Sequence, residues 1–278
     1  MKCTLCNNKK LSILTAVNGV KIYQCKKCQL ALVGQNRTHR LNSSSQYNLK
    51  NYKKQEPRLR KRYEKIIRIV NQVKPKGRAL DIGAGYGLLA SMLPARKYQV
   101  EILEPFLTPS YAKRKNIIQH KTSLAAFAPQ KKYDLVFLID VIEHFPNPVR
   151  NLRKIKKLLA KNGLIIIQTP NYQNFMAKIC HYWPGWMVKN HKQIYSPQSL
   201  KGLLRKMGFT PLRLTTYDSL YEFRESLNGV CTRIKRPSLR KLLKLLALAF
   251  TVPAYLLLRH VLWHFGWGGL IFTTAQKD

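Results

Sequence analysis

Three glycines at alternate positions form the stretch of this sequence best suited to bind a ligand with its backbone. Gly83, Gly85 and Gly87 follow an apolar run, 79–82, that is interrupted by Asp81. A buried parallel strand ends in this way where the backbone must turn sharply and pass close to a ligand. The apolar residues after the glycines predict a helix. Strand, glycine-rich turn and helix form the first unit of a nucleotide-binding α/β sheet.

An acidic residue after the next predicted strand, 99–103, completes this expected ligand site. Glu104 follows that strand directly. Because the carboxyl ends of parallel strands meet at one edge of a sheet, its carboxylate should lie beside the glycine turn, where it can accept hydrogen bonds from a ribose diol. The spacing G-x-G-x-G differs from the G-x-G-x-x-G of dinucleotide sites. An NAD-binding domain or a Rossmann domain without activity is the alternative.

Four of the six cysteines are arranged as two C-x-x-C pairs, a pattern that suits metal binding. The pairs consist of Cys3, Cys6, Cys25 and Cys28. Each pair can present two thiolates to one tetrahedral ion, and Asn18-Gly19 between the pairs predicts a hairpin turn. Residues 1–33 are therefore predicted to form a zinc ribbon with one structural Zn²⁺, which so short a segment needs in order to fold. A redox C-x-x-C is the alternative, but no βαβ pattern surrounds either pair.

The glycine turn and Glu104 together resemble motif I and the second-strand acid of the class I S-adenosylmethionine (SAM)-dependent methyltransferases. The stretch 134–148, DLVFLIDVIEHFPNP, is similar to the fourth strand and post-strand motif of the ubiquinone-type O-methyltransferases and their small-molecule relatives. The resemblance covers roughly 57–217 and 268–276. It implies a Rossmann-like α/β fold with a seven-stranded sheet, SAM as cofactor, and methyl transfer as the reaction.

The resemblance also implies which residues contact SAM. They are Asp81, Gly83, Ala84, Gly85, Gly87, Glu104, Asp140 and Val141. Backbone N–H groups of the turn are expected beside the amino-acid part of SAM, and Glu104 beside the ribose. In ubiquinone-type relatives the equivalents of Asp140, Glu143 and His144 resemble a divalent-metal site, D-x-x-E-H.

Two histidines are candidates for the general base that methylation of an oxygen nucleophile requires. His144 belongs to the post-strand motif, and His191 lies in an aromatic-rich segment, 170–195, after the fifth strand of the predicted sheet. A histidine titrates near neutral pH, so either can accept the proton of an acceptor hydroxyl. A histidine in a loop more often has a structural role, so the sequence leaves a catalytic and a structural role open for each of the two. The aromatic segment is expected to form a substrate cap or a small packed cap without a ligand.

Apolar periodicity and turn residues predict the remaining elements. Strands are expected at 78–82, 99–103, 116–120, 133–139, 163–169, 211–217 and 268–275, and helices at 58–73, 86–93, 109–115, 148–160 and 196–208. Pro148 and Ser196 mark two helix starts. The expected organisation is a zinc ribbon (1–33), a linker (34–56), a methyltransferase domain (57–232), an insertion (233–265) and the last strand of the sheet (266–278).

The charge of the chain and its predicted insertion point to an anionic partner. The sequence has 50 Lys and Arg but only 12 Asp and Glu, a formal net charge of +38. Such a field attracts anionic lipid, nucleic acid or phosphorylated substrates. A solvated basic surface or a biased genome composition is the alternative explanation of the charge. Within the insertion, 245–258 carries no charge but contains Pro253, and it is shorter than the roughly 20 residues that span a bilayer. We expect two short helices on an anionic membrane surface. Packing on the methyltransferase domain or in a dimer is the alternative.

These patterns predict a SAM-dependent methyltransferase that acts on a small-molecule or lipid-linked acceptor. The amino terminus has no secretory signal pattern, so we expect a cytoplasmic protein at the inner face of the cell membrane. An RNA methyltransferase is the first alternative, favoured by the charge and the zinc ribbon but not by the post-strand motif, which lacks the N/D-P-P-[FY] pattern of base N-methylation. A non-catalytic interaction module is the second.

Overall fold

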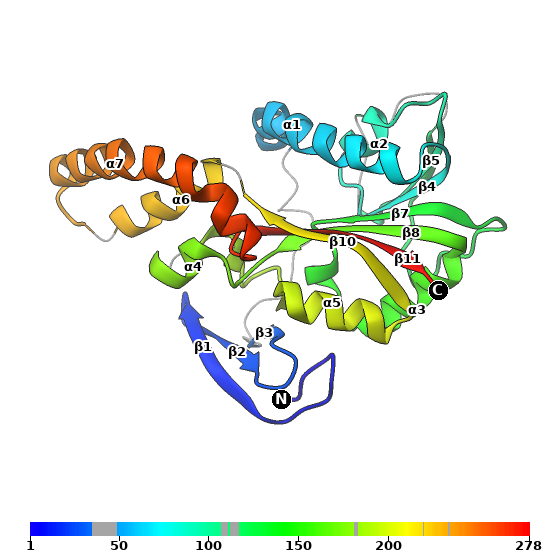
Figure 1. Ribbon diagram of the computed structural model, residues 1–278, viewed down its shortest axis with the longest axis horizontal. Helices are drawn as coiled ribbons and strands as arrows, with labels where there is room; N and C mark the ends of the chain where they lie inside the picture. The colour runs from blue at the N-terminus through cyan, green and yellow to red at the C-terminus, as the bar shows by residue number, and fades with distance from the viewer. Residues whose placement is uncertain (35–48, 107–110, 112–116, 181–182, 219, 233) are drawn as a thin grey trace.

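The computed structural model describes residues 1–34, 49–106, 111, 117–180, 183–218, 220–232 and 234–278 (Figure 1). Its central feature is a seven-stranded sheet in the order β10-β11-β8-β7-β4-β5-β6. The strands are β4 (Gly77–Ile82), β5 (Tyr98–Leu103), β6 (Ile117–His120), β7 (Tyr133–Ile139), β8 (Leu159–Pro170), β10 (Phe209–Tyr217) and β11 (Leu270–Lys277). Strand β11 alone runs against its neighbours in this sheet. The predicted seven-stranded fold is confirmed.

Helices cover both faces of this sheet (Figure 1). Helices α1 (Leu49–Val73) and α2 (Leu88–Met92) pack on one face, and α3 (Pro148–Leu158) and α5 (Pro197–Lys206) on the other. Helix α1 does so because its buried side chains recur at spacings of four, three, one and three positions and form one stripe, namely Leu59, Tyr63, Ile66, Ile67 and Val70. Helix α2 is shorter than predicted, since Gly87 is left-handed just before it. The helix predicted at 109–115 falls almost wholly outside the described residues.

The capping predictions for α3 and α5 are correct. Asn147 accepts a hydrogen bond from the Arg150 N–H over 2.9 Å, with Pro148 in the first turn of α3. Ser196 and Ser199 form a reciprocal capping box at the start of α5. These caps satisfy backbone donors that a helix start would otherwise leave unpaired.

The amino-terminal segment forms a second sheet that is joined to the part of the chain that carries the large sheet. Strands β1 (Leu11–Val17) and β2 (Val20–Cys25) make the predicted hairpin, and β3 (Ala31–Val33) pairs with β2. The fourth strand, β9 (Gln193–Ile194), comes from the cap region. Buried side chains of this segment also share a core with those of α3 and α5.

Two helices lie between the last two strands of the large sheet. They are α6 (Leu220–Cys231) and α7 (Pro237–His264), and they project from the sheet side by side in Figure 1. The prediction of two short pieces split at Pro253 is wrong, because α7 is one helix of 28 residues that continues through this proline. A single proline removes one backbone hydrogen bond, which the turns on either side can tolerate. By length and composition, α7 could cross a membrane.

The paired helices contact the cap. Helix α4 (Phe175–Cys180) of the cap contributes Met176 to a buried cluster with Phe223 of α6 and Tyr255 of α7. The rings of Phe223 and Tyr255 stack with their centroids 4.1 Å apart. Cap and insertion therefore lie on the same edge of the sheet.

Candidate functional site

The glycine turn between β4 and α2 leaves open space beside its backbone. Gly83, Gly85 and Gly87 have φ angles of 66°, 58° and 76°, in the left-handed region that favours glycine. A Cβ at Gly83 would lie 2.7 Å from the side chain of Val141, whereas a Cβ at Gly85 would meet nothing within 4 Å. The turn is closed by the Gly87 N–H, which donates to the Ala84 carbonyl over 2.9 Å. The space at Gly85 can thus admit a ligand that approaches the main chain.

Glu104 lies beside this space, as predicted. Its carboxylate accepts hydrogen bonds from the Gly85 N–H over 3.2 Å and from the Phe106 N–H over 3.0 Å. Burial raises the pKa of Glu104. Burial and the nearby charge of Glu104 raise the pKa of Asp81 to about 8. A carboxylate next to an open, glycine-lined cradle fits the ribose and amino-acid parts of SAM.

The carboxyl end of β7 brings Asp140 and Val141 to the same edge. Asp140 has a φ of 57° and accepts hydrogen bonds from Arg62 Nη2 over 2.7 Å and from Gln168 Nε2 over 2.9 Å. Tyr217 donates a hydrogen bond to Gln168 in turn. Arg62 and Gln168 were not predicted from the sequence. Arg62 is one of 50 cations, and its position on α1 shows no pattern that distinguishes it.

Tyrosines gather around the glycine turn. The ring of Tyr52, on α1, lies 4.8 Å from that of Tyr86 in the turn and 6.0 Å from that of Tyr111, measured between centroids. Tyr111 donates a hydrogen bond to Glu56 of α1. These contacts place the start of α1 next to the turn. The sequence contains no recognisable signal for this cluster, because its members are far apart along the chain.

A second group of polar side chains follows β7 in the short 3₁₀ helix η2 (Ile142–His144). The ligand atoms of Glu143, His144 and His191 all lie within 4.8 Å of one another. Glu143 is fully buried; its Oε2 accepts a hydrogen bond from Thr169 Oγ1 over 2.9 Å, while its Oε1 has no hydrogen-bond partner and lies 4.0 Å from His191 Nε2. Burial raises the pKa of Glu143 to about 8 and lowers that of His191 to about 3.

This geometry changes the metal set that the resemblance implied. Asp140 is occupied by Arg62 and Gln168, so the potential ligands that the structure brings together are Glu143, His144 and His191. Imidazole nitrogens and a carboxylate oxygen suit a divalent transition metal, and the unpaired Glu143 Oε1 fits such a role.

Comparison with known proteins supports the interpretation of the glycine turn. Residues 53–214, more than half of the chain, match a family described as a methyltransferase domain. The chain belongs to the class I SAM-dependent methyltransferases.

Two curated relatives of this methyltransferase are ubiquinone biosynthesis O-methyltransferases. The protein from Rickettsia akari is 31% identical over 138 residues, which cover 46% of this chain and 55% of the relative. The protein from Cereibacter sphaeroides is 28% identical over 152 residues, 49% of this chain and 61% of the relative. The chain thus spans less than two thirds of the length of either relative.

Solved structures agree on the fold. A Thermotoga maritima SAM-dependent methyltransferase superimposes with a TM-score of 0.54 at 16% identity, covering 83% of this chain and 96% of that one. A Burkholderia thailandensis N1-methyltransferase, solved with S-adenosylhomocysteine, gives a TM-score of 0.50 at 14% identity, with 92% of this chain and 98% of that one covered. At these identities the similarity concerns the fold alone.

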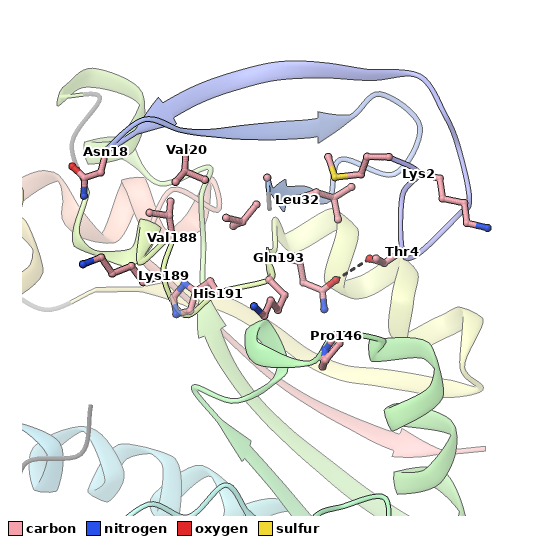
Figure 2. Close-up of a pocket in the computed structure, with 14 residues that line it drawn as sticks. Lys2, Thr4, Asn18, Val20, Leu32, Pro146, Val188, Lys189, His191 and Gln193 are labelled. Carbon is pink, nitrogen blue, oxygen red and sulfur yellow. Dashed lines mark hydrogen bonds between the residues drawn. The ribbon is translucent and has the colours of Figure 1, made fainter. Parts of the chain in front are cut away.

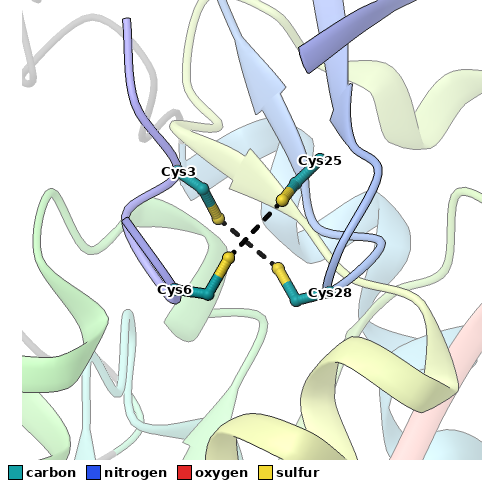
Figure 3. Close-up of side chains that lie close together, drawn as sticks. All are labelled: Cys3, Cys6, Cys25 and Cys28. Atoms are coloured by element: carbon teal, nitrogen blue, oxygen red, sulfur yellow. Dashed lines mark hydrogen bonds between the residues drawn. The ribbon is translucent and has the colours of Figure 1, made fainter. Parts of the chain in front are cut away.

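The four paired cysteines of the methyltransferase converge in space (Figure 3). The Sγ atoms of Cys3 and Cys28 are 3.4 Å apart, those of Cys6 and Cys25 are 3.5 Å apart, and all four lie within 4.8 Å of one another. Tetrahedral Zn²⁺ with Zn–S bonds of about 2.3 Å separates its sulfurs by about 3.8 Å. The hydrogen bond between Cys3 and Cys28 lowers the pKa of Cys3 to about 5 and raises the pKa of Cys28, so this pair holds one thiolate and one thiol until a metal replaces the proton. The cluster therefore has the composition and the spacing of a structural zinc site.

Proposed function

We propose that this protein transfers the methyl group of SAM to a small-molecule or lipid-linked acceptor at the cytoplasmic face of a membrane. The observation that carries the proposal is the open cradle at Gly85 with the Glu104 carboxylate beside it, at the same edge as the segment that follows β7. The similarity to ubiquinone biosynthesis O-methyltransferases supports a small acceptor.

Binding and orientation by this chain account for most of the proposed catalysis. SAM supplies an already activated methyl group when bound. Glu104 would hold the ribose hydroxyls, and the main chain of the turn, whose Gly85 N–H donates to Glu104, would lie against the amino-acid part. Asp140, fixed by Arg62, would border the same space. Holding two reactants in line supplies a large share of the rate in such a displacement.

His144 is the general base that we propose for an acceptor hydroxyl. Its side chain is exposed, and its Nδ1 lies 3.2 Å from the Asn190 carbonyl, to which a protonated Nδ1 would donate. In that tautomer Nε2 carries a free lone pair that can take a proton. His191, with its low pKa, is the weaker base of the two predicted histidines and would serve to position His144, whose ring centroid is 5.0 Å away.

We further propose that the cysteine cluster holds one structural Zn²⁺ and that α7 rests on an anionic membrane. Four thiolates close the coordination sphere, which leaves no position for a substrate. Helix α7 exposes many large apolar side chains, among them Leu246, Phe250 and Leu257. Cations precede its apolar part, at 235–244. Attraction to an anionic leaflet is worth about 1 kcal/mol per cation near the surface.

The proposed activity is tested with SAM that carries a labelled methyl group. The purified protein is incubated with a total cell extract, which is then separated into lipid, small-molecule and RNA fractions, and Glu104→Ala serves as the inactive control. Label in the lipid or small-molecule fraction is the expected result. Label in RNA would instead support an RNA methyltransferase, and failure of the wild-type protein to bind SAM would refute both. Repeating the assay with and without an added divalent cation separates a metal role of His144 from a base role.

A further inference from the structure

A pocket lies between the amino-terminal sheet and the cap of the methyltransferase (Figure 2). Its volume is about 580 Å³, which lies within the range of about 300–1,000 Å³ typical of small-molecule sites. Residues of β1–β3 and their flanks form one wall, and residues 188–193 and Pro146 form the other. The pocket is therefore built jointly by the cysteine-containing segment and the methyltransferase domain.

Hydrogen bonds fix the two walls relative to each other. Thr4 Oγ1 donates to Gln193 Oε1 over 2.8 Å, and Gln193 Nε2 donates to the Phe145 carbonyl over 2.7 Å. The backbone of Lys192 bridges in the same way: its carbonyl accepts from the Val33 N–H over 3.1 Å, and its N–H donates to the Glu143 carbonyl over 2.9 Å. The pocket is thus a preformed feature tied to the segment after β7.

His191 connects the pocket to the proposed reaction centre. Its ring forms part of the pocket wall, lies 4.0 Å from Glu143 at its Nε2, and is in edge contact with the ring of His144. The segment that carries Glu143 and His144 begins beside Val141, whose side chain closely approaches Gly83 of the glycine turn. Within the described part of the chain, none of the residues that line the pocket belongs to the cradle around Gly85, and the connection between the two runs through the buried side chains of His191 and Glu143.

The lining has the chemistry of a site for an organic anion. Three cations, Lys2, Lys189 and Lys192, lie at its rim, and none of the described lining residues carries a carboxylate. Apolar side chains supply much of the remaining wall, including Val20, Leu32, Val188 and Pro146. Ammonium groups attract a phosphate or carboxylate, while the apolar wall can bury a hydrocarbon or ring portion.

We propose that this pocket is a second ligand site of the protein, and that it binds an organic anion that carries a phosphate or carboxylate beside an apolar portion. This site is distinct from the cradle and goes beyond the proposed function. The amino-terminal segment then has two roles: its cysteine cluster stabilises a fold, and that fold supplies one wall of the anion site.

Calorimetric titration of the full chain with phenyl phosphate, benzoate and benzyl alcohol tests the proposal. We expect at least one of the two anions to bind, and the stronger of them identifies the preferred anionic group. Benzyl alcohol should bind at least tenfold more weakly. The double variant Lys189→Ala/Lys192→Ala should weaken anion binding at least tenfold. The control Lys161→Ala/Lys201→Ala removes two exposed lysines outside the pocket and should change it less than twofold. Equal losses in the two variants, or binding of neither anion, would overturn the proposal.

Two further measurements locate the bound probe and separate the inference from the proposed function. In ¹³C-methyl NMR spectra, the anion should shift the methyl signals of Val20 and Val188; shifts confined to leucines of α7 would contradict the proposal. SAM binding is titrated in the same proteins. If wild type binds SAM and neither anion, the inference alone fails; if wild type does not bind SAM, the proposed function fails.

Discussion

Arg62, in the middle of α1, donates a hydrogen bond over 2.7 Å to Asp140, which directly follows β7 at the carboxyl edge of the sheet. The two residues are 78 positions apart. Asp140 has a left-handed backbone, with a φ of 57°, a conformation that costs energy for a residue other than glycine and persists only where neighbouring contacts hold it. The ion pair therefore joins the first helix to the turn that borders the cofactor cradle.

Substitution Arg62→Ala should weaken SAM binding and destabilise the protein. Loss of the guanidinium leaves Asp140 with Gln168 as its side-chain partner, which should cost about 1–3 kcal/mol of the free energy of unfolding. Urea denaturation and calorimetry with SAM measure the two effects. Arg68→Ala, an exposed arginine of the same helix, is the matched control and should change neither. Wild-type values for Arg62→Ala would show that the ion pair is incidental.

Two changes at the cradle should reduce SAM affinity without unfolding the protein. Glu104→Ala removes the carboxylate expected at the ribose and should cost about 1–3 kcal/mol of binding. Gly85→Val fills the open space beside the turn and strains a backbone with a φ of 58°. Gly202→Val, at an exposed position of helix α5 with nothing within 4 Å of an added Cβ, is the control for a glycine outside the cradle. Unchanged SAM affinity in both cradle variants would refute the assignment.

The purified protein should contain one Zn²⁺ per chain, measured by elemental analysis after preparation without chelator. Cys25→Ser should lose the metal and lower the melting temperature. The destabilisation should extend beyond residues 1–33, because Leu5, Leu30 and Leu32 share a core with α3 and α5. The control Cys231→Ser changes a buried cysteine outside the cluster and should retain zinc. Protein free of zinc would contradict the proposed site.

Helix α7 should bind vesicles that contain anionic lipid at low salt, and raised salt should weaken the binding because charge attraction is screened. Leu246→Glu/Leu257→Glu places charges on side chains that are 46% and 80% exposed, and it should reduce co-flotation at least tenfold. Ile13→Glu/Leu212→Glu, at 60% and 50% exposure on strands β1 and β10, tests whether any exposed apolar residue would have the same effect. Wild-type protein that stays entirely in the soluble fraction would contradict the proposed contact of α7 with the membrane.

Stability should fall as pH rises from about 4 to about 7 through Asp218. Burial raises the pKa of Asp218 to about 7 in the folded protein, and Tyr255 and Trp263 of α7 donate hydrogen bonds to it. Between its unfolded and folded pKa values the folded state holds one more proton, so the free energy of unfolding decreases by about 1.4 kcal/mol per pH unit. Asp218→Asn should make the pH profile of urea denaturation shallower by this amount. The control Glu225→Gln, on α6, should leave the profile unchanged, and an unaltered slope in Asp218→Asn would refute the assignment.

The local sequence pattern was sufficient to predict much of the fold of this protein. The alternation of apolar strands and amphipathic helices predicted the sheet, since each element buries one face or stripe and βα units connect parallel strands. The glycine turn and the position of Glu104 beside it were predictable because both depend on backbone geometry at strand ends. The C-x-x-C spacing predicted the convergence of Cys3, Cys6, Cys25 and Cys28, since each knuckle fixes two thiols within a few residues.

Contacts between distant parts of the chain needed the tertiary structure. Nothing near Arg62 in the sequence indicates Asp140 as its partner, and the ligand set of Glu143, His144 and His191 depends on how the cap folds back on the end of β7. The pairing of β9 with β3, which forms the pocket beside His191, likewise joins segments about 160 residues apart and leaves no periodic signal in either one. Local sequence determines elements and turns, because these depend on backbone preference and burial pattern. The choice of partners across the molecule is decided only when the elements pack.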